Sequence, residues 1–164
     1  MYRVGDKVLY GVHGVCLIKD QEVKTVDRQK VQYYVLEPLE NPGAKYYIPS
    51  EKPAAVAKLS PLLTHQELNL LLQNHQIPEG TWIPEENRRK QRYRELLCSS
   101  DRPALLAMIR VLRAHKQDQL SKGKKFHLCD DNFLREAESL FYAEVSAVLN
   151  MTASAAKDYV EPYL

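Results

Sequence analysis

The chain has 164 residues, of which 45% are hydrophobic and 27% charged, with a formal net charge of +2 at pH 7. These values are those of one ordinary globular domain or two small ones. The sequence has no apolar run of the ~18 residues needed to cross a bilayer, and its start, MYRVGDKV, is charged and unlike a signal peptide. We therefore expect a cytoplasmic protein with no membrane contact.

The first fifty residues alternate with the two-residue period of strands and are rich in β-branched and aromatic side chains. The expected strands are residues 7–10, 15–18 continuing through 21–26, 31–39 and 44–49. Turns are expected at Asp27-Arg28-Gln29 and at ENPG (40–43), and Pro49 and Pro53 end the β region. Short strands at about ten-residue spacing suggest a small twisted barrel.

The stretch YGVHG (10–14) lies between the first two expected strands. Gly11 and Gly14 permit a tight corner there, which a strand interior would not favour. His13 lies close to Cys16 but has too few further ligands nearby for a metal site. We interpret it as a turn residue.

From about residue 62 the hydrophobic period becomes helical, and about five helices are expected. Thr64 and Glu67 have the spacing of a capping box, and Asp101 and Thr152 precede further helical runs. The other helices are expected from Pro84 to about Cys98 and from Asp130 or Asp131 onward, with a proline-broken stretch at 76–84. The fold class is therefore α+β, with a β domain at residues 1–55 and a compact all-helical domain at residues 62–164.

Motifs for catalysis are absent from the sequence. It has no Gly-x-Ser-x-Gly, no phosphate-binding glycine loop and no Cys or His ladder with metal spacing. The neighbouring carboxylates Asp130-Asp131 and Glu85-Glu86 are interpreted as caps of helix N-termini. The odd, scattered cysteines, Cys16, Cys98 and Cys129, fit free thiols in a reducing compartment. We expect no enzymatic activity, no cofactor and no metal.

Basic residues are concentrated in residues 88–125, which have twelve Lys/Arg and three Asp/Glu, a net charge of +9. A basic helix and a basic loop are expected to bind the phosphate backbone of a nucleic acid with little base specificity. The candidate residues are Arg88, Arg89, Lys90, Arg92, Lys122, Lys124 and Lys125. The alternative is a solvated charged face with no partner.

Trp82, the one tryptophan, lies in the proline-broken stretch just before the basic helix. It is either a plug at the edge of the helical core or an apolar wedge pressed into a minor groove beside the arginines. The sequence leaves both interpretations open.

The stretch YRVGDKVLYGVHGVCLI (2–18), with KVQYYVLEP (30–38) and YYIP (46–49), resembles the CarD/CdnL family of bacterial transcription regulators. Its Val-Gly-Asp-x-Val-x-Tyr-x-x-His-Gly pattern is also similar to the polymerase-interacting module of the transcription–repair coupling factor. RYRELL, SSD and LSKGKK resemble the helical domain of the same family.

The resemblance implies that residues 1–55 form a Tudor-like barrel that binds the β-subunit lobe of RNA polymerase. The lobe contacts of the family fall on Lys24 and on Tyr47, where the family usually has a basic residue, with Lys45 and Tyr46 as substitutes. The helical domain would contact promoter DNA at the upstream edge of the bubble and stabilise the open complex. The wedge tryptophan of the family falls near Glu86, a turn after Trp82.

We therefore predict a monomeric transcription regulator whose partners are the RNA polymerase β subunit and promoter DNA. The alternative is a stand-alone Tudor-like module that reads nucleic acid or peptide through an aromatic cage. Such a cage would be built from Tyr33, Tyr34, Tyr46 and Tyr47.

Overall fold

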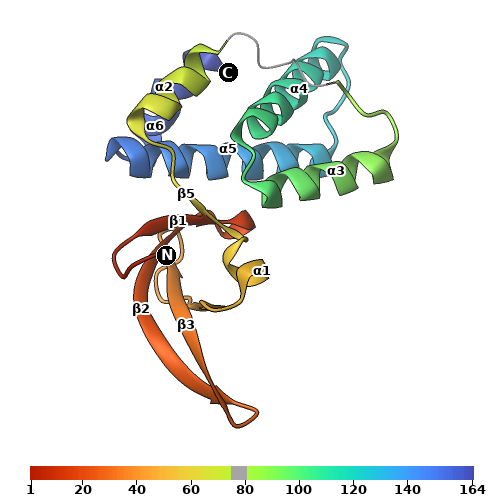
Figure 1. Ribbon diagram of the computed structural model, residues 1–164. Coiled ribbons are helices and arrows are strands. Elements are labelled where there is room, and N and C mark those ends of the chain that lie inside the picture. Colours follow the sequence, from red (N-terminus) through yellow and green to blue (C-terminus); the bar gives the residue numbers. More distant parts are fainter. Residues whose placement is uncertain (75–80) are drawn as a thin grey trace. The chain divides into compact units, whose positions relative to one another are not determined.

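The computed structural model describes residues 1–74 and 81–164. The chain divides into two compact units, Met1–Leu62 and Leu63–Leu164, which we call the β unit and the helical unit. Figure 1 shows both units in sequence colours. The described residues contain no helix long and apolar enough to cross a membrane.

The β unit is a five-stranded antiparallel sheet with the strand order β4-β3-β2-β1-β5. Its strands are β1 (Lys7–Tyr10), β2 (Val15–Val26), β3 (Gln29–Pro38), β4 (Tyr46–Pro49) and β5 (Leu59–Pro61). Together with the helices that follow in the second unit, this sheet confirms the predicted α+β class.

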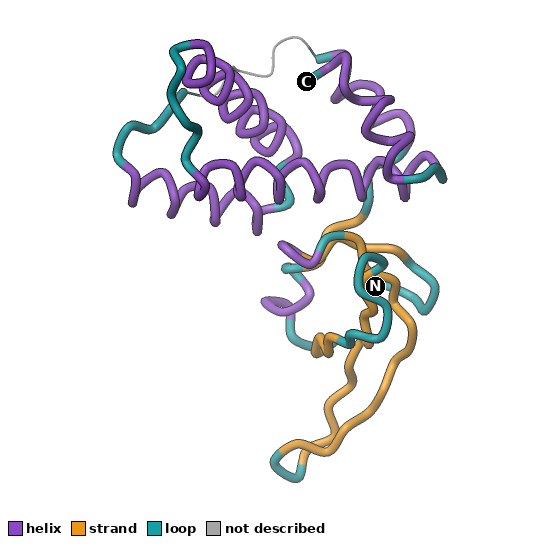
Figure 2. Tube along the Cα trace, turned by 180° about the vertical axis from the view of Figure 1, so that it is seen from behind, coloured by secondary structure: helices purple, strands orange, loops and turns teal. Residues whose placement is uncertain are grey.

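Strands β2 and β3 form a long ribbon that extends well beyond the other strands (Figure 2). Asp27 and Arg28 join them with positive φ angles of 49° and 63°, and Val26 pairs with Gln29. Positive φ at both central residues belongs to the two-residue type I′ turn, whose twist matches that of the strands. The predicted turn is confirmed, with Gln29 already part of the strand.

The corner predicted at YGVHG is confirmed. Residues Gly11–His13 form a single 3-10 turn, and the backbone N–H of Tyr10 donates to the carbonyl of Gly14 at 3.0 Å. Gly11 and Gly14 have φ angles of 48° and 67°, in the left-handed region that glycine adopts without steric cost.

The prediction that prolines end the β region is wrong. After a short helix, α1 (Pro53–Val56), strand β5 pairs with β1, with Leu59 opposite Tyr10. Leu59 joins the core of the β unit, whose other buried members include Val8, Ile18 and Leu36. A three-residue strand is too short for alternation to reveal it in the sequence.

The helical unit has the five predicted helices: α2 (His65–Gln73), α3 (Glu86–Ser99), α4 (Arg102–Ser121), α5 (Leu128–Leu149) and α6 (Ala153–Val160). The capping box of Thr64 and Glu67 is confirmed, and the side chains of Asp101 and Thr152 accept backbone N–H groups as predicted. Part of the predicted break at 76–84 lies outside the described residues.

Helix α5 is the longest helix and packs against both α4 and α6 (Figure 1). Its stripe of Phe133, Ala137, Phe141 and Val145 is buried in the core of the unit. The prediction that Asp130 and Asp131 cap backbone N–H groups is wrong, but both lie in the first turn, where the helix dipole favours a negative charge as predicted. The helix begins at Leu128, so both carboxylates lie inside its first turn, where they bind basic side chains instead.

Candidate functional site

One face of the sheet carries a cation from β2 beside two aromatic rings, one from β3 and one from β4. The Lys24 Nζ lies 3.3 Å from the centroid of the Tyr47 ring and 3.6 Å from a carboxylate oxygen of Glu22. The Tyr33 ring packs edge-on against Tyr47 at 6.3 Å. We call these four residues the Lys24 face. The β-sheet pairing brings them together, because Tyr33 is paired with Glu22 and lies on the strand next to Tyr47.

The four tyrosines of the predicted cage do not converge. Tyr34 is 3% exposed and belongs to the core of the β unit. The Tyr46 ring packs on the same core and lies 4.2 Å from the His13 ring, centroid to centroid. Successive residues of a strand point to opposite faces, so Tyr33 and Tyr47 lie on the other side of the sheet. The structure therefore gives no support to an aromatic cage.

Helix α3 begins at a carboxylate cap beside its basic residues. The Glu85 side chain accepts the backbone N–H groups of Asn87 and Arg88, at 2.9 and 2.7 Å, which confirms its predicted capping role. The exposed side chains of Arg88 and Arg92 follow one turn apart. A shallow groove of about 350 Å³ lies on this surface, lined by Ile83, Arg88, Gln91, Arg92 and Glu95.

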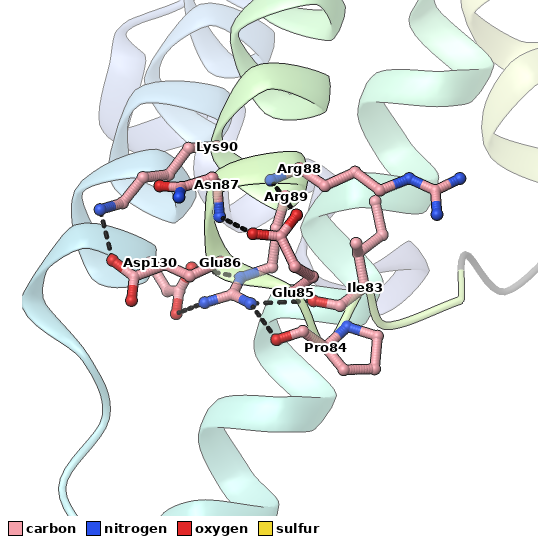
Figure 3. A network of polar contacts seen from close by, with 9 residues as sticks. All are labelled: Ile83, Pro84, Glu85, Glu86, Asn87, Arg88, Arg89, Lys90 and Asp130. Carbon is pink, nitrogen blue, oxygen red and sulfur yellow. Dashed lines mark hydrogen bonds and ion pairs between the residues drawn. The ribbon is translucent and has the colours of Figure 1, made fainter.

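Arg89 is different, because its side chain points into the helical unit (Figure 3). It is 6% exposed, and its Nε and Nη2 donate to the two carboxylate oxygens of Asp130 at 2.9 and 3.0 Å. Its Nη1 donates to the backbone carbonyls of Ile83 and Pro84 at 2.8 and 3.3 Å. Burial acts to lower the pKa of Arg89, but the hydrogen bond and charge of Asp130 outweigh it and raise the pKa. The expectation that Arg89 contacts DNA has no support here, since its donors bind protein oxygens.

Lys90 is half-buried and forms an ion pair with Glu86 one turn earlier on α3. The hydrogen bond between the two groups raises the pKa of Lys90 and lowers that of Glu86. Of the four candidate cations on α3, Arg88 and Arg92 are therefore the more accessible.

Trp82 lies at the edge of the helical core. Its ring stacks on the His115 ring with a centroid distance of 3.5 Å and an interplanar angle of 13°. The Arg89 guanidinium carbon lies 4.3 Å from the indole centroid. His115 had no recognisable signal in the sequence, and burial lowers its pKa.

The second basic cluster follows the end of α4. The backbone N–H of Gly123 donates to Leu120 and that of Lys124 to Gln119, at 3.0 and 2.9 Å, which is the Schellman ending of a helix. This ending leaves three lysines exposed: Lys122, Lys124 and Lys125. Lys122 pairs with Asp118 at 2.8 Å.

A chain of ring contacts links the two basic clusters. Phe126, just after the lysines, lies 6.2 Å from His115 between ring centroids, and His115 stacks on Trp82. The loop after α4 and the loop before α3 therefore both have a ring beside His115 of α4. The sequence predicted the two clusters but not this connection.

The residues that the structure describes include no group of three or more His, Cys, Asp or Glu that could hold a metal ion. The three cysteines are free. Burial raises the pKa of the Cys16 thiol to about 11, whereas Cys98 is exposed near the end of α3.

The β unit is similar to a known protein family. Residues 2–60 match the family model described as the CarD-like/TRCF RID domain. The match covers nearly the whole β unit, including the Lys24 face, and leaves out the helical unit. A search of curated proteins found no match to the chain.

Proposed function

Since its β unit is a CarD-like/TRCF RID domain, an RNA polymerase-interacting domain, we propose that this chain is a CarD-like transcription regulator that binds the β-subunit lobe of RNA polymerase. CarD-like domains are typically non-catalytic, although TRCF is an enzyme. We propose a binding protein without catalysis, which acts in the cytoplasm, at the nucleoid, wherever polymerase is bound.

The proposed polymerase contact is the Lys24 face, with the exposed Lys45 just before β4. Tyr47 is 38% exposed and the Lys24 side chain 42% exposed, so an ammonium group and an aromatic ring are presented together on one face of the sheet. Such a surface can bind a carboxylate or a carbonyl and pack against an apolar side chain at once. Tyr46 is packed on the core of the β unit, so it supports this surface from behind.

The proposed DNA contact is the basic end of the helical unit. Arg88 and Arg92 on α3, with Lys122, Lys124 and Lys125 after α4, supply exposed cations for backbone phosphates. Lys90, held by Glu86, is a weaker candidate. Phosphate contacts fix position and carry no sequence information, so we propose low base specificity.

The proposed mechanism is a tether. Binding to polymerase raises the local concentration of the helical unit at the promoter, so a weak DNA affinity suffices. If the unit prefers the melted junction over closed duplex, it stabilises the open complex by that difference alone. A preference of about 1–2 kcal/mol would change the open-complex population roughly 5- to 30-fold.

The observation that carries the proposal is the match of residues 2–60, and the test is the lifetime of open promoter complexes. Added full-length chain should lengthen that lifetime on polymerase from the same organism, and no effect would contradict the proposal. Lys24→Glu should abolish both this effect and recovery of the β subunit in a pull-down. The matched control is Lys30→Glu, because Lys30 pairs with Thr25 on the opposite face of the same ribbon.

DNA binding is tested by its salt dependence. Arg88→Gln and Arg92→Gln should each lower the slope of log affinity against log salt by about 1. Arg94→Gln is the matched control, since Arg94 is exposed on the same helix but about 200° around its axis from Arg92. Equal slopes for all three variants and the wild type would contradict a phosphate contact on α3.

A further inference from the structure

One arginine in the basic run of α3, Arg89, is buried and ion-paired, whereas Arg88 beside it is exposed. Arg89 lies beside the exposed Arg88 in the sequence, but its guanidinium is bound to Asp130 of α5 at 2.9 and 3.0 Å. The side chains of the pair are 7% and 2% exposed. Arg89 therefore has its charge balanced inside the helical unit.

A buried ion pair is weak evidence for stability. Removing two charges from water costs several kcal/mol, and apolar residues of similar volume often serve the fold equally well. What the pair provides here is geometry, because the planar guanidinium holds its five N–H groups in a fixed fork. Its Nε and Nη2 donate to the Asp130 carboxylate. Its Nη1 donates to the backbone carbonyls of Ile83 and Pro84.

These two carbonyls belong to the segment that leads into α3. Ile83 and Pro84 precede the capping residue Glu85 and so lie outside α3, and their carbonyls accept the Nη1 of Arg89. Arg89 thus ties the entry of its own helix to the first turn of α5. The same guanidinium lies 4.3 Å from the indole of Trp82, which His115 of α4 holds from its own side. Arg89 therefore connects α3, α5 and the loop before α3 directly, and it connects them to α4 through Trp82.

The segment held in this way forms one edge of the groove on α3. Ile83 lines the groove together with Arg88 and Arg92. A displaced entry segment would move Ile83 and the first turn of the helix, with Arg88 on it. From this geometry we propose that Arg89, bound to Asp130, is a positioning residue that does not contact DNA itself. It holds Ile83 in place beside Arg88, so that the Arg88 guanidinium can bind a DNA phosphate. The proposal rests on the proposed function of the helical unit in DNA binding.

The first test removes one negative charge and asks whether the DNA affinity rises or falls. Asp130→Asn removes a negative charge at the DNA-binding end, so a purely electrostatic role would strengthen DNA binding. The positioning role predicts the opposite, a loss of affinity of about tenfold, which corresponds to one weakened charge-assisted hydrogen-bond pair. Binding is measured by fluorescence anisotropy of a labelled promoter duplex with the full chain. An increased or unchanged DNA affinity would overturn the proposal.

The second test separates positioning from stability. The double variant Arg89→Met with Asp130→Leu replaces the pair by packed apolar side chains and should keep the melting temperature. We expect it to lose DNA affinity by about tenfold while amide exchange in residues 81–88 becomes about tenfold faster, because the carbonyl clamp is gone. A variant that keeps the melting temperature, the slow exchange and the DNA affinity would overturn the proposal.

The exchange measurement is made on the protein alone and does not depend on DNA. If Arg88→Gln bound DNA as well as the wild type, the proposed phosphate contact would be wrong. Unchanged exchange in the apolar double variant would instead show that Arg89 does not position the segment. The two failures are therefore distinguishable.

Discussion

Each end of helix α5 has a buried carboxylate that is bound by an arginine of another helix. Near its start, Asp130 is bound bidentately by Arg89, and near its end, Glu144 is bound bidentately by Arg102 at 2.8 and 3.1 Å. The two carboxylate residues are 1% and 2% exposed. Each pair connects α5 to the beginning of another helix.

The two pairs differ in what else they hold. Glu144 also accepts the backbone N–H of Leu63 at 3.0 Å, and Arg102 donates to the carbonyl of Ser100 at 3.0 Å. These contacts join segments of the framework, the first residue of the helical unit and the junction between α3 and α4. The Asp130 end holds a loop that borders exposed basic residues. The role of a buried ion pair therefore follows from the further hydrogen-bond partners of its two residues.

The largest expected loss of stability comes from breaking the Arg102–Glu144 ion pair near the end of α5. Glu144→Ala removes the carboxylate that binds the partly buried Arg102 and the acceptor of the Leu63 N–H, so it should cost about 3–5 kcal/mol in the free energy of unfolding. Urea denaturation measures this. Glu136→Ala, an exposed site on the same helix, is the matched control and should change stability by less than about 0.5 kcal/mol. Similar losses in both variants would remove the framework role of Glu144.

A smaller loss of stability is expected at the Asp130 end of α5, from the substitution Trp82→Ala. Full burial of a tryptophan makes truncation cost about 3–5 kcal/mol, and this ring is half-buried, so about 2 kcal/mol is expected. Trp82→Phe should recover much of it by stacking on His115. Denaturation monitored by circular dichroism decides the matter. A stability equal to that of the wild type would favour the interpretation of Trp82 as an exposed wedge.

A weaker effect should appear as a pH dependence at the Asp130 end of α5, through His115. Burial lowers the pKa of His115, with Arg89 and Lys122 adding to it and Asp130 and Asp118 opposing it. The unfolded chain therefore binds this proton at higher pH than the folded chain. The free energy of unfolding should fall as pH drops from the usual histidine value of about 6.5 toward the lower folded value.

The measurement is urea denaturation at several pH values between 5 and 8. His115→Gln should flatten the slope in this range relative to the wild type. Parallel curves for the two proteins would show that His115 does not contribute to it.

The smallest expected change in stability is at Asp131, which follows Asp130 in the sequence but is bound by more exposed cations. A hydrogen bond from Lys116 lowers the pKa of Asp131, and Arg135 adds to the effect. Both cations are partly exposed, so Asp131→Asn should cost only about 0.5 kcal/mol at neutral pH. Since the folded pKa is the lower one, this stabilisation exists above the unfolded pKa and is lost as pH falls through the folded value. The difference between variant and wild type should accordingly close in acid, as denaturation at pH 7 and pH 2–3 would show.

Periodicity and capping residues predicted the five helices and four of the strands, because these signals are local. Strand β5 was missed, since its three residues pair with β1 about fifty residues earlier in the chain. Such a partner cannot be read from a short sequence window.

In the candidate site too, a residue far away in the sequence decides which side chains are exposed, so a local sequence window could not predict them. Arg88 and Arg89 are identical in type and adjacent in sequence, yet one is exposed and the other is 6% exposed. Adjacent positions on a helix differ by about 100°, and the partner that selects the inward one, Asp130, is 41 residues away. The composition of the run predicted a basic surface but not which of its members form it.

The three cysteines have a practical consequence for studying this chain. With a pKa of about 11, the Cys16 thiol is almost entirely protonated at neutral pH and resists alkylating reagents. Cys98 is exposed near the end of α3, the helix that carries Arg88 and Arg92, and Cys129 is half-buried. In a Cys129→Ser background, a maleimide dye would therefore label α3 at one natural position. Energy transfer from that dye to a labelled promoter would then follow this helix on and off the DNA without any introduced thiol.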